Sequence, residues 1–324
     1  MRVLLVKMSS LGDVIHTLPA LEDALRAWPG LRFDWVVEEA FAEVPAWHPG
    51  VSRVIPVALR RWRRSPFDAL RSGEWARFRA ALKEQPYELV IDAQGLLKSA
   101  FVARLAGAPC AGYDRTSARE PLASCAYRQR VVVARECHAI ERTRRLFAAL
   151  LGYAAQDTGA CYGIDRTRLG PTPAAGGVLF LHGTSRADKC WPEESWMALG
   201  ERVTRSGRTV LLPWGNEEEH ARAQRIAQGL PAARVLPRMR LGEIGALLCG
   251  VNAAVAVDTG LGHLAAALGV PCVSLYGPTR IELIGTRGEN QRHVRSASGV
   301  LADIGTGEVW DALCAALQAE PRVC

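Results

Sequence analysis

The stretch Ala253–Pro278 reads AAVAVDTGLGHLAAALGVPCVSLYGP and places a short helical segment between two apolar runs. Residues 253–257 and 272–276 have the composition of buried strands, whereas residues 261–268 are rich in alanine and leucine, which favour a helix. This order predicts a strand, a turn, a helix and a parallel strand, the unit from which α/β sheets are built. The turn DTGLGH then lies at the carboxyl end of the first strand, where helix N-termini bind anions.

The residue types of this turn fit a diphosphate site. Thr259, Gly260 and Gly262 leave room for a diphosphate to approach the backbone, and His263 adds a donor. They fit equally well a helix capped by Asp258 with glycines that pack the helix on the sheet. The turn alone leaves both interpretations open.

Both halves of the chain repeat the same order of apolar strand, turn and amphipathic helix. Further strands are expected at 2–6, 33–37, 53–57, 88–92 and 111–113, and again at 178–182, 208–213 and 233–236. A helix is expected over 14–27, because Val14, Leu18, Leu21 and Leu25 form one apolar stripe. A segment rich in Pro, Gly and Thr, RTRLGPTPAAGG (166–177), separates the halves. The pattern predicts two doubly wound domains with a cleft between them, as the length of 324 residues also suggests.

Composition limits the function classes. With 49% hydrophobic and 23% charged residues, and no apolar run of about 18 residues, the chain is typical of a soluble enzyme without a membrane span. The start MRVLLVKMSSLGD reads as a buried strand and not as a signal peptide. The nine cysteines show no C-x-x-C spacing, which indicates reduced thiols and a cytoplasmic location. A dinucleotide fingerprint and a P-loop motif are both missing from the sequence.

The positive charge is concentrated in the first half. Residues 1–150 contain 23 Lys and Arg against 16 Asp and Glu, whereas residues 151–324 contain 17 of each. The excess peaks at Arg60, Arg61, Arg63 and Arg64. Such a cluster fits a polyanionic substrate, an acidic membrane surface or nucleic acid, and it also fits an ordinary solvated face.

Three polar segments follow strands, where a cleft would be lined. In KMSSLGD (7–13), Ser9, Ser10 and Gly12 offer donors, and Asp13 is placed to remove a proton from a hydroxyl, although Ser10 or Asp13 also suits a helix cap. LHGTSRADKCW (181–191) supplies hydroxyl groups and a cation where a nucleotide phosphate would lie. In PWGNEEE (213–219), a carboxylate suits either ribose hydroxyls or the N-terminus of the next helix.

Together these segments resemble the bacterial lipopolysaccharide heptosyltransferases of glycosyltransferase family 9, in the same order from the first strand to about residue 285. The matching stretches are KMSSLGDVIHTLPAL, the arginine cluster, HGTSRADKCWPEESW, LLPWGNEEE and DTGLGHLAAALGVPCVSLYGPT. Lys189 precedes Cys190 and not the arginine usual in the enzymes that add the second heptose, so the likeness is greatest to those that add the first. The resemblance implies a GT-B fold, with an acceptor domain over 1–165 and a nucleotide-sugar domain over 166–324. Its last helix, about 307–317, is expected to pack back on the first domain.

The resemblance also implies roles for individual residues. Asp13 matches the general base, and Lys189 would stabilise the departing diphosphate. The candidate donor-binding residues are Ser9, Ser10, Gly12, Thr184, Ser185, Lys189, Glu219, Met239, Asp258, Thr259, Gly260, Leu261 and His263. Glu219 adjoins Glu217 and Glu218, so a slip of one residue would change that assignment. The candidate acceptor-binding residues are Arg60, Arg61, Arg63, Arg64, Arg119 and His138.

The function that these matches imply is inverting transfer of heptose from ADP-heptose to a Kdo hydroxyl of Kdo-lipid A, in lipopolysaccharide inner-core biosynthesis. The expected partners are these two substrates and the cytoplasmic face of the inner membrane of a Gram-negative cell, with no nucleic acid. Neither a metal nor another cofactor is expected, because protein donors supply the anion site. Two alternatives stay open: another GT-B sugar transferase, such as the second heptosyltransferase, and a non-catalytic basic module that binds anionic membrane or nucleic acid.

Overall fold

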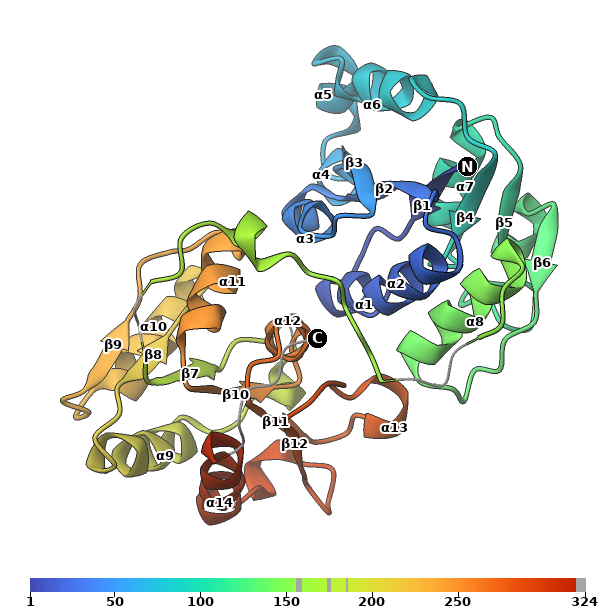
Figure 1. The fold of residues 1–324 in the computed structure, drawn as a ribbon. Helices are drawn as coiled ribbons and strands as arrows, with labels where there is room; N and C mark the ends of the chain where they lie inside the picture. The colour runs from blue at the N-terminus through green and yellow to red at the C-terminus, as the bar shows by residue number, and fades with distance from the viewer. Residues whose placement is uncertain (156–158, 174–175, 185, 319–324) are drawn as a thin grey trace. The chain divides into compact units, whose positions relative to one another are not determined.

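The chain forms two compact α/β units, Met1–Asp165 and Arg166–Cys324 (Figure 1). This is a computed structural model, which describes residues 1–155, 159–173, 176–184 and 186–318. Each unit contains one six-stranded sheet, in the order β3-β2-β1-β4-β5-β6 in the first and β12-β11-β10-β7-β8-β9 in the second. Neighbouring strands within both sheets run parallel. The predicted α/β fold with two doubly wound sheets is confirmed.

The elements of the first unit alternate along the chain. Its strands are β1 (Arg2–Val6), β2 (Arg32–Glu38), β3 (Val51–Val57), β4 (Leu89–Asp92), β5 (Cys110–Tyr113) and β6 (Gln129–Val131). Its α-helices are α1 (Leu11–Ile15), α2 (Leu18–Ala27), α3 (Glu43–Ala46), α4 (Leu59–Trp62), α5 (Pro66–Arg71), α6 (Glu74–Lys83), α7 (Leu97–Leu105) and α8 (Ala139–Leu151).

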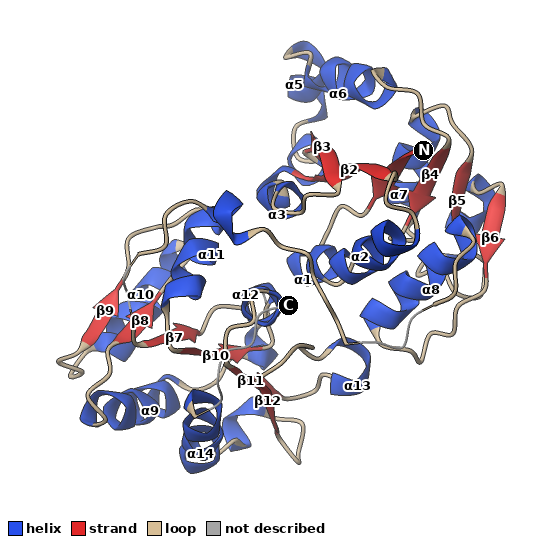
Figure 2. Ribbon diagram, in the orientation of Figure 1, coloured by secondary structure: helices blue, strands red, loops and turns tan. Residues whose placement is uncertain are grey.

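The second unit repeats the pattern. Its strands are β7 (Val178–Leu181), β8 (Val210–Leu212), β9 (Ala233–Val235), β10 (Ala253–Val257), β11 (Cys272–Tyr276) and β12 (Gln291–Arg295). Its α-helices are α9 (Glu193–Arg205), α10 (Glu217–Ala227), α11 (Leu241–Gly250), α12 (Gly260–Ala267), α13 (Ile281–Ile284) and α14 (Thr306–Leu317). In both units helices flank the sheet on its two faces (Figure 2). The central strands are therefore buried along nearly their whole length, as their apolar sequences require.

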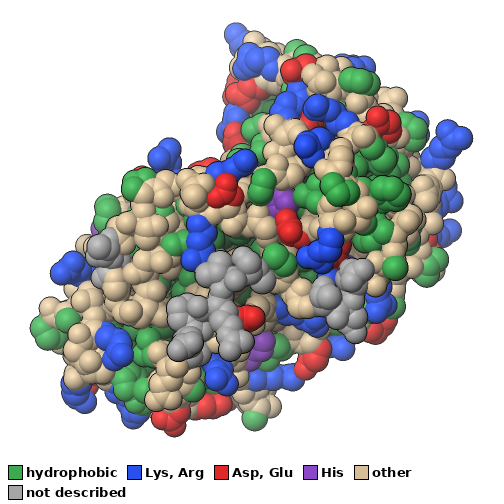
Figure 3. All heavy atoms as spheres, in the orientation of Figure 1, with side chains coloured by type: hydrophobic (Ala, Val, Ile, Leu, Met, Phe, Trp, Pro, Cys, Tyr) green, Lys and Arg blue, Asp and Glu red, His purple; other side chains and the backbone are tan. Residues whose placement is uncertain are grey.

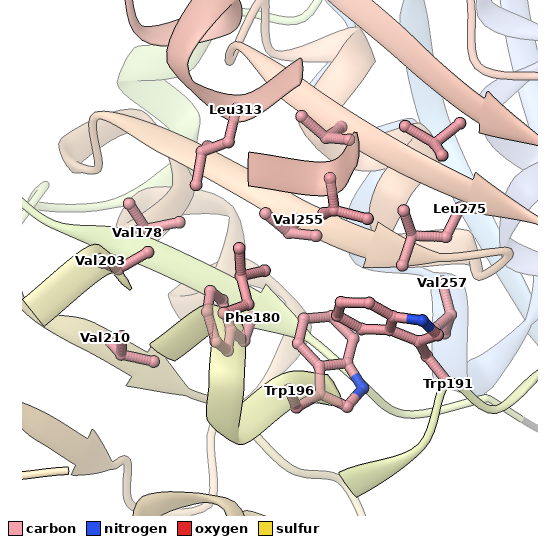
Figure 4. Close-up of a cluster of buried hydrophobic side chains, with 14 of the residues drawn as sticks. Val178, Phe180, Trp191, Trp196, Val203, Val210, Val255, Val257, Leu275 and Leu313 are labelled. Atoms are coloured by element: carbon pink, nitrogen blue, oxygen red, sulfur yellow. The ribbon is translucent and has the colours of Figure 1, made fainter. Parts of the chain in front are cut away.

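An aromatic cluster anchors one polar loop of the second unit. The rings of Phe180 and Trp196 lie 4.9 Å apart, and those of Trp191 and Trp196 lie 5.1 Å apart, beneath Val255 and Val257 (Figure 4). The indole N–H of Trp191 donates to the backbone carbonyl of Ile304 at 3.1 Å. Because Trp191 follows the loop after β7 directly, its burial fixes where that loop ends.

The structure corrects two details of the sequence prediction. The helix expected over 14–27 is divided into α1 and α2, because Pro19 cannot donate a backbone hydrogen bond and suits only the first turn of α2. Strands β6 and β12 were not predicted, since their sequences QRV and QRHVR are mostly polar and lie at sheet edges. Within the second unit, helix α14 packs on β10–β12 and α9, and its packing on the first domain stays a prediction.

A buried ion pair joins α2 to α8 in the first unit. The Arg144 guanidinium donates to both carboxylate oxygens of Asp23, from Nε at 2.5 Å and from Nη2 at 3.1 Å. Both side chains are almost fully buried. Since neither charge has access to water, each depends on the other for compensation.

We expect Asp23→Ala to lower the free energy of unfolding by about 3–5 kcal/mol, because it leaves a buried guanidinium without its main partner. Glu201→Ala is the matched control, since Glu201 pairs with Arg205 at 2.8 Å on the exposed surface of α9. Its effect should stay below about 1 kcal/mol. Urea unfolding followed by circular dichroism measures both variants, and equal losses would contradict the assigned importance of the buried pair.

Candidate functional site

Asp13 lies in the first turn of α1, directly after β1, and four donors surround its carboxylate. The backbone N–H and the hydroxyl of Ser10 donate to Oδ2 at 3.1 and 3.2 Å. On the other oxygen, Oδ1, the Nη2 atom of Arg119 lies at 2.6 Å and the Nζ atom of Lys7 at 3.5 Å. Asp13 therefore helps to cap the helix with one oxygen, while the second oxygen forms ion pairs.

The charges around Asp13 determine its protonation. Burial by itself would raise the pKa of Asp13, but the positive charges of Lys7 and Arg119 and the Ser10 N–H outweigh it. They hold the pKa of Asp13 well below its usual range. Burial in turn lowers the pKa of Lys7, although the neighbouring Asp13 partly opposes that shift. The carboxylate is thus ionised at neutral pH, as a proton acceptor must be.

The loop after β4 contacts the segment that leads from β1 to Asp13. Ala93 accepts a hydrogen bond from the Lys7 ammonium at 3.1 Å, and the side chain of Gln94 accepts one from the Met8 N–H at 2.8 Å. The carboxylate of Asp92 accepts the N–H groups of Gln94 and Gly95 at 2.9 and 3.1 Å, which fixes the loop. Asp92 is fully buried, and burial raises its pKa.

A small pocket opens beside Asp13. Its volume is about 20 Å³, enough for one water molecule or hydroxyl group. The side chains that line it include Lys7, Gln94, Tyr113, Arg119, Arg142 and Thr143. These residues follow or face β1, β4 and β5, so the pocket lies at the carboxyl edge of the sheet, where α/β proteins bind ligands.

The arginine cluster follows β3 at the same carboxyl edge, and its members differ. The guanidinium of Arg61 is engaged by two carboxylates, Glu39 at 3.1 Å and Glu74 at 2.9 Å. Arg60 lies over the Phe41 ring, with its guanidinium carbon 5.8 Å from the ring centroid. Arg63 and Arg64 are exposed, and within the described residues neither forms an ion pair with a carboxylate within 4.0 Å. The geometry gives Arg61 a structural role and leaves the other three available for an anion.

His138 is buried and caps helix α8. Its Nδ1 accepts the backbone N–H of Ile140 at 3.2 Å, and its ring meets that of His16 edge to face at 5.4 Å. His16 lies one turn after Asp13 and adds to the positive potential at that carboxylate. The structure therefore places His138 behind the Asp13 pocket, and its contact with an acceptor stays a prediction.

In the second unit, three loops converge on Asp258. The Lys189 ammonium and the Thr279 hydroxyl both lie 2.5 Å from its Oδ2 atom. The Thr184 hydroxyl donates to the Asp258 backbone carbonyl at 3.4 Å. Because β7, β10 and β11 are neighbours in the sheet, the loops that follow them meet at one edge. Lys189 is thus held beside the turn that the sequence singled out.

The DTGLGH turn forms the beginning of α12. Thr259 is its N-cap residue, and Gly260, Leu261, Gly262 and His263 form the first turn of the helix. The Gly262 N–H donates to the Thr259 carbonyl at 3.1 Å, whereas the N–H groups of Gly260 and Leu261 precede the first carbonyl partner of the helix. A Cβ at Gly262 would lie 3.2 Å from the Cβ of Ala256, so this glycine serves close packing on β10. The expected cap by Asp258 is wrong, because Thr259 is the N-cap residue and the Asp258 carboxylate contacts Lys189 and Thr279. The diphosphate interpretation stays a prediction.

Glu219 is distinguished from its two neighbours. Its Oε2 accepts the Gly215 N–H at 2.7 Å, and a Cβ at Gly183 would lie 2.7 Å from its carboxylate. Glu219 thus faces the loop after β7, whereas Glu217 and Glu218 are exposed. Met239 lies half-buried between β9 and α11. Ser185 lies outside the described residues.

Sequence reasoning missed several residues of these sites. Lys7 belongs to the motif KMSSLGD but was given no role. A charged residue directly after a buried strand could have indicated a functional position. Thr279 likewise stood in the last motif. Gln94 and Arg142 gave no signal, since the fold alone brings them to Asp13.

The described residues show neither a metal-binding cluster nor a helix that could span a membrane. No group of three or more His, Cys, Asp or Glu side chains among them is placed to hold a metal ion. None of the helices in the described part of the chain is long and apolar enough to cross a membrane.

Comparison with known proteins identifies the family. Residues 75–311 match the model of glycosyltransferase family 9 (heptosyltransferase). Lipopolysaccharide heptosyltransferase 1 of Pseudomonas aeruginosa is 58% identical over 91% of this chain and 84% of that protein. Lipopolysaccharide heptosyltransferase 1 of Escherichia coli K12 is 49% identical over 97% of this chain and 99% of that protein.

Solved structures agree with the sequence comparison. The structure of E. coli heptosyltransferase WaaC with ADP superimposes with a TM-score of 0.92 at 47% identity, and covers 98% of this chain and 100% of that one. A second structure of that enzyme, with ADP-2-deoxy-2-fluoro heptose, has a TM-score of 0.89 at 46% identity and covers 97% and 99%. This chain belongs to glycosyltransferase family 9, the heptosyltransferases.

Proposed function

We propose that this protein transfers L-glycero-D-manno-heptose from ADP-heptose to a Kdo hydroxyl of Kdo-lipid A, a step of lipopolysaccharide inner-core biosynthesis. The observation that carries the proposal is near full-length similarity to the lipopolysaccharide heptosyltransferases 1 of P. aeruginosa and E. coli. A non-catalytic basic module, the alternative from another class, does not agree with membership of a glycosyltransferase family.

The comparisons also favour the first heptosyltransferase over the second. A lipooligosaccharide heptosyltransferase 2 from Haemophilus influenzae aligns at 28% identity over only 37% of this chain. The E. coli heptosyltransferase II structure shares the fold at 21% identity. The heptosyltransferases 1 of E. coli K12 and Salmonella typhimurium are each 49% identical over 97% and 96% of this chain, whereas that of Campylobacter coli is 23% identical over 86%.

In the proposed reaction, Asp13 removes the proton from the acceptor hydroxyl. That oxygen attacks the anomeric carbon of the heptose from the face opposite ADP, and the bond from this carbon to the diphosphate oxygen breaks. The configuration at the anomeric carbon is therefore inverted. Asp13 is ionised at neutral pH, and its place in the first turn of α1 puts it at the carboxyl edge of the sheet.

The second unit supplies the donor site. Negative charge develops on the departing diphosphate, and the free N–H groups at the start of α12 and the Lys189 ammonium are placed to stabilise it. Asp258 and Thr279 hold the loops in position, and Thr184, Glu219 and Met239 belong to the nucleotide site. Protein donors take the role that a magnesium ion has in other transferases, so we propose that no metal is required.

The acceptor domain also offers a surface for the membrane that contains Kdo-lipid A. On α5, Phe67 and Leu70 are 79% and 62% exposed and lie one turn apart, beside the exposed Arg63, Arg64 and Arg71. Basic and hydrophobic side chains stand next to each other over α5 and α6 (Figure 3). Exposed apolar side chains flanked by arginines are typical of proteins that bind an anionic bilayer from one side. We infer peripheral contact with the cytoplasmic face of the inner membrane.

Release of ADP on incubation with ADP-heptose and Kdo-lipid A tests the proposed function. Omission of either substrate, and replacement of Kdo-lipid A by its heptosylated form, are the controls. ADP release that needs no acceptor, or that occurs only with the heptosylated form, would contradict the assignment.

Asp13→Asn should lower kcat by about 100-fold or more and leave the dissociation constant of ADP unchanged, because the amide keeps the shape of the side chain but cannot accept the proton. Steady-state kinetics and calorimetric titration with ADP measure the two quantities. Near-normal turnover with reduced thermal stability would instead leave Asp13 as a helix cap only.

Lys189→Ala and His263→Ala should each raise the dissociation constant of ADP about 10- to 150-fold, since a buried charge-assisted hydrogen bond contributes roughly 1.5–3 kcal/mol. Arg186→Ala is the matched control, because Arg186 lies in the same loop but is exposed and pairs with Asp188. Calorimetric titration with ADP measures these dissociation constants. Unchanged values in both test variants would mean that the diphosphate binds elsewhere.

Replacement of Arg60, Arg63 and Arg64 by glutamine should raise KM for Kdo-lipid A about 10-fold or more and leave KM for ADP-heptose unchanged. Arg61 is retained, because its loss would also release Glu39 and Glu74. The wild-type affinity for the acceptor should fall as salt rises, since the contacts are charge pairs near the surface.

A soluble, deacylated acceptor separates the two uses of this surface. We expect the triple variant to keep its raised KM with that acceptor, whereas Phe67→Ser with Leu70→Ser should lose liposome binding at normal KM. If the triple variant loses only liposome binding, the arginines contact the membrane and not the acceptor.

A further inference from the structure

Asp13 has no free oxygen in the structure. The N–H and hydroxyl of Ser10 donate hydrogen bonds to Oδ2, and the Arg119 guanidinium donates one to Oδ1, which the Lys7 ammonium also approaches to 3.5 Å as an ion pair. The adjoining pocket has room for only one water-sized group. An acceptor hydroxyl can therefore reach Asp13 only after one of the donors has moved away.

Arg119 is the charged donor that can leave. The Ser10 N–H belongs to the same turn as Asp13, and the Lys7 side chain is only 7% exposed and is fixed by the carbonyl of Ala93. The Arg119 side chain is 48% exposed, and in the described part of the chain it donates a hydrogen bond only to Asp13, at 2.6 Å.

The backbone beneath Arg119 is well held, so only its side chain needs to move. Asp114 accepts the N–H groups of Thr116 and Ser117 at 3.1 and 2.9 Å, and Glu120 donates its N–H to Gly95 at 3.0 Å. The other guanidinium at the pocket, that of Arg142, is tied to the carbonyl of Ser117 at 2.6 Å and lies over the Tyr113 ring. Rotation of the Arg119 side chain alone would open one oxygen of Asp13.

Displacing Arg119 requires a competing anion. A neutral sugar cannot compete with Asp13 for a guanidinium, because a carboxylate forms charge-assisted, forked hydrogen bonds that a hydroxyl cannot replace. The acceptor of the proposed function ends in a sugar acid, whose carboxylate lies on the same ring as the hydroxyl that is to be activated. One substrate thus carries both the anion and the reacting group.

We propose that Arg119 masks the general base in the free enzyme, and that the carboxylate of the acceptor sugar acid unmasks it by taking over the guanidinium. Recognition of the sugar acid and activation of the base are then one event. An acceptor without a carboxylate leaves Asp13 covered, so Arg119 determines acceptor specificity as well as contributing to binding. This inference rests on the proposed function, because it takes a sugar acid as the acceptor.

The electrostatics agree with this sequence of events. Against the effect of burial, Lys7 and Arg119 are the two largest charges that lower the pKa of Asp13, with His16 of α1 a smaller one. Once the acceptor carboxylate neutralises Arg119, Lys7, the Ser10 N–H and His16 still oppose the effect of burial, but one of the two largest opposing charges is lost. The pKa of Asp13 then rises towards its usual range, which makes the carboxylate a stronger base when the hydroxyl arrives.

A double-mutant cycle on acceptor binding tests the proposal without turnover. The probe is deacylated Kdo-lipid A, titrated by calorimetry at neutral pH in the absence of donor. Arg119→Gln should weaken binding about 10-fold or more. Asp13→Asn should tighten binding about three- to tenfold, because Arg119 is then free in advance, and this gain should vanish in the Arg119→Gln background. Arg115→Gln, an exposed arginine of the same turn, is the control and should change little.

A second probe identifies the anion. Deacylated acceptor with its Kdo carboxylate converted to the amide should bind the wild type about 10-fold more weakly than the acid does, and Arg119→Gln should not distinguish the two. If Arg119→Gln still binds the acid more tightly than the amide, another cation of the protein binds the Kdo carboxylate. Equal effects of Asp13→Asn in both backgrounds would mean that no mask exists.

Wild-type turnover separates this proposal from the proposed function. If the wild type releases ADP with Kdo-lipid A, but the effects of Asp13→Asn and Arg119→Gln on acceptor binding are additive, only the proposal that Arg119 masks Asp13 is contradicted. An enzyme that neither binds the deacylated acceptor nor uses Kdo-lipid A overturns both.

Discussion

The proposed chemistry depends on one interaction, in which the Asp13 carboxylate lies between the cations of Lys7 and Arg119. Burial disfavours the charged form of a carboxyl group, so Asp13 stays ionised only because positive charges lie within 3.5 Å. Lys7 itself is buried and needs the Ala93 carbonyl and Asp13 for compensation. The loop after β4, which the buried Asp92 holds in place, is therefore part of the same charge arrangement.

The second unit has a comparable arrangement. Lys189 pairs with Asp258 at the carboxyl edge of its sheet, as Lys7 pairs with Asp13 in the first unit. The difference lies in what surrounds each pair. Asp13 faces a pocket for one small group, whereas Asp258 lies next to free N–H groups at the start of a helix. The first pair suits a base, and the second suits a site for an anion.

The sequence predicted those parts of the fold in which local pattern and burial agree. The unit β10-α12-β11 was predicted correctly, because apolar strands flank a helix of small residues and the turn between them contains Asp, Thr and Gly. The edge strands β6 and β12 were missed, since edge strands need no continuous apolar run. Contacts distant in sequence were not predictable: only the fold brings Arg119 to Asp13, 106 residues apart, and pairs Arg61 with Glu39 and Glu74.

The central claim is a single displacement in which Asp13 activates the acceptor and protein donors alone stabilise the departing ADP. The anomeric configuration of the transferred heptose tests it most directly, when the product is formed from Kdo-lipid A in the presence of EDTA and analysed by NMR. We expect product in the chelator, with the configuration opposite to that of the donor. Retained configuration, or no product until magnesium is restored, would contradict it.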